Sequence, residues 1–199
     1  MNNLQNHKSL NNRYFVMRHG ESKANAKRII ISHPENGVKE DFALTELGQK
    51  QAEASAKESK LGEQTVIYCS DFSRARETAE IVQKVLNASP IHVTHKLRER
   101  YFGDWESSDS ANYHKVWDHD LSSASHTNDN VEAINSVLDR ATGLIVELEG
   151  KYNDKDILLV SHGDTLQILQ TSFQGSEPNK HRSLNHLDVA EIRRLELAV

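Results

Sequence analysis

The chain has 199 residues, of which 37% are hydrophobic and 27% charged, and this length and composition predict one globular domain with a core of its own. Its formal net charge of -5 argues against nucleic acid as a partner, because proteins that bind nucleic acid carry basic surfaces. A single cysteine, Cys69, excludes an internal disulfide bond and a thiolate-rich metal site.

Residues 1–13 are polar and rich in asparagine, and we expect them to form a flexible N-terminal arm ahead of a single domain over 14–199. This segment lacks the apolar stretch of a signal peptide, and no apolar run in the chain is long enough to span a membrane. We therefore expect a cytoplasmic protein without a membrane partner. Nothing in the sequence indicates the oligomeric state.

Short apolar runs alternate with helical patterns along the chain. The runs predict strands over 14–17, 64–69, 91–93 and 157–160, and a last strand within 187–195. Apolar residues at helical spacing predict helices over about 45–60, 71–87, 131–149 and 163–173. The stripe of the first helix is thin and consists mainly of Leu47, Ala54 and Leu61. Such alternation predicts an α/β fold, a three-layer α/β/α sandwich with a mostly parallel central sheet.

Two segments break this alternation. Residues 18–42 contain turn residues and are predicted to form a long loop. Between about 100 and 130, Gly, Ser, Asn, His and Asp dominate, with Trp105 and Trp117 as isolated apolar anchors. We interpret this second segment as an insertion folded over the functional site, followed by capping residues at 128–130 for the next helix.

Arginine and histidine residues follow three of the predicted strands. The first strand ends at Arg18 and His19, Arg74 follows the second, and His162 and Gly163 follow the strand over 157–160. Because ligands bind beyond the carboxyl ends of strands in such sheets, these side chains can meet around one anion. The helix that begins at Gly163 would direct free N–H groups and its positive dipole end toward the same anion.

These residues belong to motifs that resemble the histidine phosphatase superfamily, which includes the cofactor-dependent phosphoglycerate mutases. Five motifs occur in family order: Arg18-His19-Gly20-Glu21-Ser22 with Asn25; Leu44-Thr45-Glu46-Leu47-Gly48 with Gln51-Ala52; Ser73-Arg74-Ala75 with Glu77-Thr78-Ala79; Leu97-Arg98-Glu99 with Phe102-Gly103-Asp104-Trp105-Glu106; and Val160-Ser161-His162-Gly163. The resemblance covers the chain from about Tyr14 onward and implies a phosphoglycerate mutase-like sandwich.

The resemblance also implies roles for the strand-end residues. His19 would be the nucleophile that becomes transiently phosphorylated, while Arg18, Arg74 and His162 bind the transferring phosphoryl group and Asn25 assists. Imidazole can form such a covalent intermediate, and guanidinium groups hold phosphate oxygens in a planar fork. The neighbouring cations disfavour imidazolium and so help to keep His19 neutral. Because they also supply the positive charge, we expect no metal and no cofactor.

Glu99 stands where the family carries the acid that protonates the leaving alcohol. Without the resemblance, the favoured interpretation of Glu99 is an ion pair with Arg98 or Arg100 on a solvated turn. Ser22 is expected to support the nucleophile loop by hydrogen bonds. Together with Asn25, Arg100 and Gly163 it is also a candidate for substrate contact. Arg76, on a different helix face from Arg74, is expected to form a structural ion pair.

The family contains both phosphatases and mutases. Residues 104–130 hold no Arg, one Lys and six acids, which are Asp104, Glu106, Asp109, Asp118, Asp120 and Asp129. A lid of this charge would repel a doubly phosphorylated glycerate. The run Phe102-Gly103-x-Trp105-Glu106 is also similar to the phosphatase branch, whereas Arg100 is a feature that mutases share. Ser107 and the pair Glu132-Ala133 depart from the family pattern on the substrate side.

We therefore expect a histidine acid phosphatase-type phosphoric monoester hydrolase that acts on a small phosphorylated substrate. A cofactor-dependent phosphoglycerate mutase is one alternative. A catalytically silent phosphate-binding regulatory module is another, although it would require the loss of His19 or Glu99, and both are present. A metal hydrolase is disfavoured because the scattered histidines lack ligand spacing.

Overall fold

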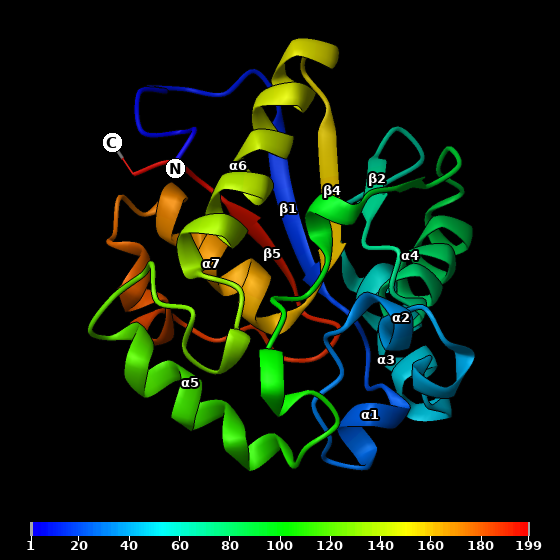
Figure 1. Ribbon diagram of the computed structural model, residues 1–199. Helices are drawn as coiled ribbons and strands as arrows, with labels where there is room; N and C mark the ends of the chain where they lie inside the picture. Colours follow the sequence, from blue (N-terminus) through cyan, green and yellow to red (C-terminus); the bar gives the residue numbers. More distant parts are fainter. Residues whose placement is uncertain (1, 199) are drawn as a thin grey trace.

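The computed structural model describes residues 2–198 and contains a five-stranded sheet in the order β3-β2-β4-β1-β5 (Figure 1). Strands β1, β2, β3 and β4 are parallel, and only β5 runs antiparallel, beside β1 at one edge. The predicted mostly parallel sheet is thereby confirmed. Its strands span Arg13–Arg18 (β1), Val66–Cys69 (β2), His92–Val93 (β3), Asp156–Ser161 (β4) and Ile192–Leu195 (β5).

Long helices cover both faces of the sheet, as the predicted three-layer sandwich requires. Helices α6 (Ile134–Lys151) and α7 (Gly163–Phe173) pack on one face, and α3 (Glu46–Glu58) and α4 (Ser73–Leu86) pack on the other. Alternate residues of each strand face opposite helix layers, because successive side chains of a strand point to opposite sides. Both faces of β4 are buried, which explains its uninterrupted apolar run.

Short helices fill the segments predicted as loops. They are α1 (Lys23–Ala26), α2 (Pro34–Gly37) and α5 (Tyr113–Asp120), with 3-10 turns at Glu40–Phe42, His95–Leu97, Gly103–Trp105, Ser110–Asn112, Asn128–Asn130 and Pro178–Ser183. In Figure 1, α1 and α5 lie beyond the carboxyl ends of β1 and β4, where the arrowheads point. The segment around α5, residues 100–130, is called the lid below.

Two helix details differ from the sequence prediction. Helix α3 buries Gly48, Ala52 and Ala56, while Leu47 is 52% exposed, so its inner face consists of small residues rather than the predicted stripe. Helix α6 begins at Ile134 rather than at residue 131, because Val131 and Ala133 have extended backbone and Asp129 and Asn130 before them adopt positive φ angles.

The small residues of α3 bring this helix against the loop that follows β1. A Cβ atom added to Gly48 would overlap the carbonyl group of Glu21, and one added to Gly20 would overlap the carbonyl group of Gly48. Thr45 caps the helix by accepting from the Gly48 N–H, and its own N–H donates to the Glu21 carbonyl at 2.9 Å. The backbone on either side of residue 20 is therefore held rigidly by α3.

The N-terminal segment corrects the expectation of a flexible arm. Leu4 is buried in the core beneath α6, and the Asn3 amide group donates to Thr142 Oγ1 at 3.0 Å. Asn12 donates to Glu149 and to the Tyr152 carbonyl at the other end of α6. The asparagines thus form hydrogen bonds with a helix, so polar composition here does not mean a free chain. In the part of the chain that the structure describes, no helix combines the length and apolar character needed to cross a membrane.

Candidate active site

The carboxyl ends of β1, β2 and β4 meet at a cavity of about 210 Å³. Its lining includes Arg18 and His19 after β1, Arg74 in the first turn of α4, Glu99, and Gly163 at the start of α7. Sequence reasoning placed Arg18, His19, Arg74 and His162 at one sheet edge, and the family resemblance added Glu99. The parallel register of β1, β2 and β4 brings the strand-end residues together, although His162, which is fully buried, does not itself line the cavity.

The backbone of His19 is fixed on both sides. Its N–H continues the sheet ladder to the Ser161 carbonyl at 3.0 Å, and its carbonyl accepts from the Ala190 N–H at 3.2 Å. The following residue, Gly20, donates to Thr78 Oγ1 of α4 at 3.1 Å. The imidazole, 3% exposed, is therefore presented by a rigid strand end rather than by a loop free to move.

Hydrogen bonds define the tautomer of His19. Nδ1 lies 2.7 Å from the Gly20 carbonyl oxygen, which only accepts, so Nδ1 carries the proton of the neutral ring. Nε2 accepts from Arg74 Nε at 3.1 Å and therefore holds the lone pair. Burial, with Arg74 and Arg18 adding to it, holds the pKa of His19 well below its usual range. The ring is neutral at neutral pH, with its nucleophilic nitrogen at Nε2.

Several buried donors beside His19 have no partner. Among the described residues seven buried side-chain nitrogen or oxygen atoms lack a hydrogen bond, and four of them belong to Arg18 (Nε), Arg74 (Nη1) and His162 (both ring nitrogens). A buried unsatisfied donor costs about 1–3 kcal/mol, so such a concentration indicates a site for an acceptor that arrives from outside. Two guanidinium groups make that acceptor an anion.

His162 lies against His19 with ring centroids 5.2 Å apart and against the ring of Phe72 at 5.1 Å. Burial, followed by the charge of Arg74, holds its pKa well below the usual range. His162 is thus neutral, with one ring N–H available to an anion. His162 is also the residue before α7 and makes no side-chain hydrogen bond to that helix, and the Arg18 guanidinium lies beside the first helical residue, Gly163.

Glu99 is held by the start of α7. Its Oε1 accepts from the N–H of Arg100 at 2.9 Å and from the N–H of Thr165 at 3.2 Å. Burial and then the charge of Asp164 raise the pKa of Glu99. The side chain pairs with neither neighbouring arginine, because Arg98 forms a two-bond ion pair with Asp71. A carboxyl group beside the cavity whose pKa is raised by burial is suited to act as a general acid.

Ser22 and Asn25 form a capping box at α1, and both line the cavity. The N–H and hydroxyl of Ser22 donate to Asn25 Oδ1 at 3.0 and 2.9 Å. This arrangement occupies the Asn25 carbonyl oxygen and leaves its Nδ2 as the atom available to a ligand. Ser22 thus supports Asn25 by hydrogen bonds, as expected.

Arg100, which sequence reasoning offered as a substrate contact, lies outside the cavity. Its fully buried guanidinium donates to both carboxylate oxygens of Asp120 on α5, at 2.6 and 2.8 Å, and reaches Asp164 at 3.3 Å. The prediction for Arg100 is corrected because two carboxylates draw the side chain toward the lid. Arg76, by contrast, forms the expected ion pair, with Glu80 at 3.0 Å.

The acids of the lid are also turned away from the cavity. Glu106 accepts from Ser32, Asp104 accepts from Asn130, and none of the six lid acids lines the cavity. The lid instead contributes Phe102, Tyr113 and Trp117. Its charge therefore does not decide between phosphatase and mutase chemistry.

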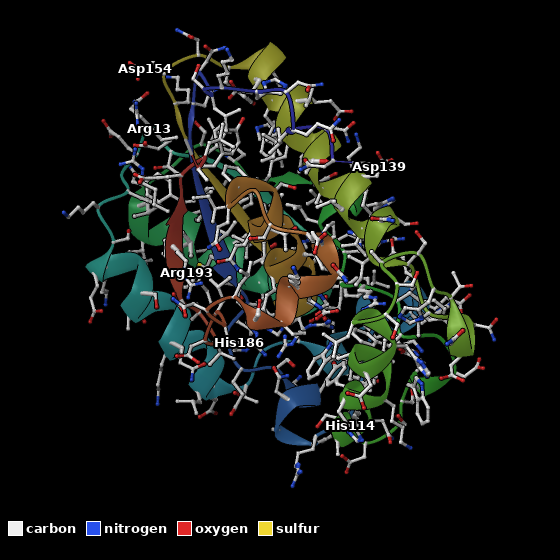
Figure 2. All side chains as sticks on the ribbon, turned by 90° about the vertical axis from the view of Figure 1, so that its left-hand side faces the viewer. Arg13, His114, Asp139, Asp154, His186 and Arg193 are labelled. Atoms are coloured by element: carbon white, nitrogen blue, oxygen red, sulfur yellow. The ribbon has the colours of Figure 1, made fainter. Side chains whose placement is uncertain are left out.

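Sequence reasoning missed part of the cavity wall. Trp117 stacks on Tyr113 with ring centroids 5.3 Å apart, and the Arg182 guanidinium lies 3.8 Å from the centre of the Trp117 ring. His186, labelled in Figure 2, accepts from Arg18 Nη1 at 2.8 Å, whereas His114 lies exposed at the far side of α5. The i, i+4 spacing of Tyr113 and Trp117 is a signal for a shared helix face. No comparable pattern marks Arg182.

No group of three or more His, Cys, Asp or Glu side chains within residues 2–198 is arranged to hold a metal ion.

Comparisons with known proteins agree with this architecture. The family model of the histidine phosphatase superfamily (branch 1) matches residues 14–198. The chain is 28% identical over 176 residues to phosphoglycerate mutase-like protein 4 of Arabidopsis thaliana, covering 85% of this chain and 74% of that protein. It is 29% identical over 164 residues to adenosylcobalamin/alpha-ribazole phosphatase of Salmonella typhimurium, covering 79% of this chain and 77% of that protein.

Among solved structures, Bacillus stearothermophilus YhfR superimposes with a TM-score of 0.78 at 26% identity, covering 93% of this chain and 91% of that one. The fold, the strand-end residues and the family match over residues 14–198 lead to one conclusion. The chain belongs to the histidine phosphatase superfamily, branch 1.

Proposed function

We propose that the protein is a metal-independent phosphomonoesterase that transfers the phosphoryl group of a small phosphorylated metabolite first to His19 and then to water. The observation that carries this proposal is a neutral His19 whose Nε2 lone pair lies among cationic donors without partners. Imidazole in this state is a nucleophile, and arginine side chains stabilise the charge that develops on phosphoryl oxygens.

In the first step the Nε2 lone pair attacks phosphorus, and the bond between phosphorus and the alcohol oxygen breaks. The Glu99 carboxyl group gives its proton to the departing oxygen, so the alcohol leaves neutral. The hydrogen bond from Nδ1–H to the Gly20 carbonyl stabilises the charge that the ring gains on phosphorylation. Arg18 and Arg74 bind the phosphoryl oxygens through their unpaired nitrogens.

In the second step a water molecule attacks phosphorus, and the bond to Nε2 breaks. Glu99, now a carboxylate, takes a proton from that water, which restores the acid and the neutral imidazole and releases inorganic phosphate. The donors from Arg100 and Thr165 hold Glu99 in position for both steps.

The remaining cavity wall supports hydrolysis of a monophosphate rather than mutase chemistry. Beyond Arg18 and Arg74 the only arginine or lysine among the lining residues is Arg182. Arg182 donates to Gln167 at 2.6 Å, lies 3.7 Å from Asp164 and stacks on Trp117, so its charge is already engaged. A phosphoglycerate would bring a carboxylate that needs a free cation. The rest of the lining instead offers the acids Glu99 and Asp164, polar groups of Ser22, Asn25, Tyr113 and His186, and apolar side chains of Ala24, Ile29, Ile31, Phe102 and Trp117.

The cavity volume bears on the size of the substrate. Sites for drug-sized ligands measure about 300–1,000 Å³, and this cavity measures about 210 Å³. Its size supports a compact ester with one phosphate and an uncharged alcohol part.

A panel of small phosphate esters assayed for release of inorganic phosphate tests the proposal. We expect turnover in the presence of a strong chelator, and an acid-labile, base-stable label on His19 when the reaction is quenched during turnover. His19→Ala should abolish both the label and the turnover. Activity that survives His19→Ala would rule out the covalent mechanism, and activity lost to the chelator and restored by metal would rule out the metal-independent one.

The alternatives give different results in the same assays. A mutase would interconvert phosphoglycerates once 2,3-bisphosphoglycerate is added and release little phosphate. A silent binding module would bind phosphate without releasing any from the whole panel.

A further inference from the structure

Tyr113, the first residue of α5, enters the cavity from the lid. Its ring is held from two sides, by Trp117 at a centroid distance of 5.3 Å and an interplanar angle of 10°, and by the edge-on Phe102 ring at 4.6 Å. A tyrosine packed in this way has little rotational freedom. Its hydroxyl group therefore occupies a defined place in the cavity wall.

The Tyr113 side chain is half-buried and lines the cavity, and its hydroxyl group forms no hydrogen bond with another described residue. Burial, then the charge of Glu99, raises its pKa, so the group is a protonated donor at all physiological pH values. The charges of Arg74 and Arg18 lower the pKa of Tyr113 in turn. Glu99, Arg18 and Arg74 line the same cavity of about 210 Å³, so Tyr113 shares this small space with the proposed acid and the phosphate-binding arginines.

We infer that Tyr113 is a catalytic residue that the lid supplies, and that its hydroxyl group donates to a non-bridging oxygen of the phosphoryl group in the transition state. This inference rests on the proposed function. The donor joins Arg18 Nε, Arg74 Nη1 and a ring N–H of His162, which are buried donors without a partner beside His19. It comes from the lid, whereas Arg18 comes from the end of β1 and Arg74 from α4, so the lid contributes to the anion-binding set.

Tyr113→Phe tests the inference, because it keeps the ring contacts with Trp117 and Phe102 and removes only the hydroxyl group. Loss of one preorganised donor to a developing oxyanion costs about 100-fold in kcat. We expect a loss of that order in kcat, with KM changed much less. A matched control is Tyr101→Phe: that ring contacts His33 at 5.5 Å, outside the cavity, and we expect wild-type kinetics.

Inhibition by vanadate and by phosphate separates a catalytic role from a packing role. Vanadate adopts the five-coordinate geometry of the transition state, so Tyr113→Phe should weaken vanadate inhibition more than phosphate inhibition. Equal vanadate inhibition in variant and wild type, or a kcat within about twofold of wild type, would overturn the inference.

Failure of the proposed function gives a separate result. If the wild-type protein releases no phosphate from any ester, the phosphatase proposal falls. Vanadate binding measured calorimetrically then still decides whether the Tyr113 hydroxyl contacts the bound anion.

Discussion

Replacing Arg100 by methionine tests how the lid is held over the site. The fully buried guanidinium makes two hydrogen bonds to Asp120 and one to Asp164, and its Nε donates to the Glu132 carbonyl at 2.8 Å. Methionine fills a similar volume but leaves both carboxylates in the interior without their arginine. Removing one partner of a buried ion pair costs about 3–5 kcal/mol. We expect the free energy of unfolding to fall by that amount and Tm to fall by about 6–20 °C.

Urea unfolding followed by tryptophan fluorescence measures this loss directly, because Trp105 and Trp117 both lie in the lid. Arg76→Met is the matched control: its ion pair with Glu80 is exposed, with side chains 60% and 44% accessible, and should contribute less than about 1 kcal/mol. Equal losses in the two variants would refute the reasoning, since the cost would then not come from burial of the Asp120 and Asp164 charges.

The same substitution has a kinetic consequence. Arg100 ties α5 to the start of α7, and α5 carries Tyr113 and Trp117 into the cavity. Misplacement of a positioning group by about 1 Å costs about 100-fold in rate. We therefore expect kcat/KM of the folded Arg100→Met protein to fall substantially at temperatures well below its Tm.

Three further predictions concern the proposed chemistry and the nucleophile loop. Glu99→Gln should lower kcat for alkyl phosphates by about 100-fold or more. The loss of kcat for p-nitrophenyl phosphate should be far smaller, because its leaving group needs no proton. Equal losses for both substrates would argue against Glu99 as the acid. The value of kcat/KM should rise with pH as His19 loses its proton, at a pKa well below the usual value of about 6.5. It should fall at higher pH as Glu99 loses its proton, at a pKa above its usual value. A rise centred at pH 6.5 would contradict the lowered pKa of His19. Gly48→Ala should impair kcat/KM while circular dichroism stays native, because the added Cβ displaces the Glu21 carbonyl. Gly62→Ala is the control: its added Cβ meets nothing within 4 Å, and kcat/KM should stay at the wild-type value.

The strand-end residues could be predicted from the sequence because the reasoning needed only element order. The apolar runs of β1, β2 and β4 predict adjacent buried strands, and the carboxyl ends of parallel strands share one edge. That rule alone brings Arg18, Arg74 and His162 toward a single anion.

The lid could not be predicted in the same way. The partners of Arg100 lie 20 and 64 residues away in the sequence, and no local pattern indicates which carboxylates will neutralise a given arginine. Helix α5 has only eight residues and buries only Val116 and Asp120, so its apolar signal is weak. The inner face of α3 is not visible in a hydropathy pattern for a related reason, because close approach of backbones selects small residues there.

The two outer strands of the sheet bear on how the protein resists aggregation. An unpaired strand edge is a template for pairing with another chain, and proteins blunt such edges by shortening or charging them. One edge, β3, is only two residues long. The other, β5, carries Arg193 and Arg194, which pair with Glu191 and Glu196 and so line this edge with charge. Edge-to-edge growth of the sheet is thereby disfavoured on both sides.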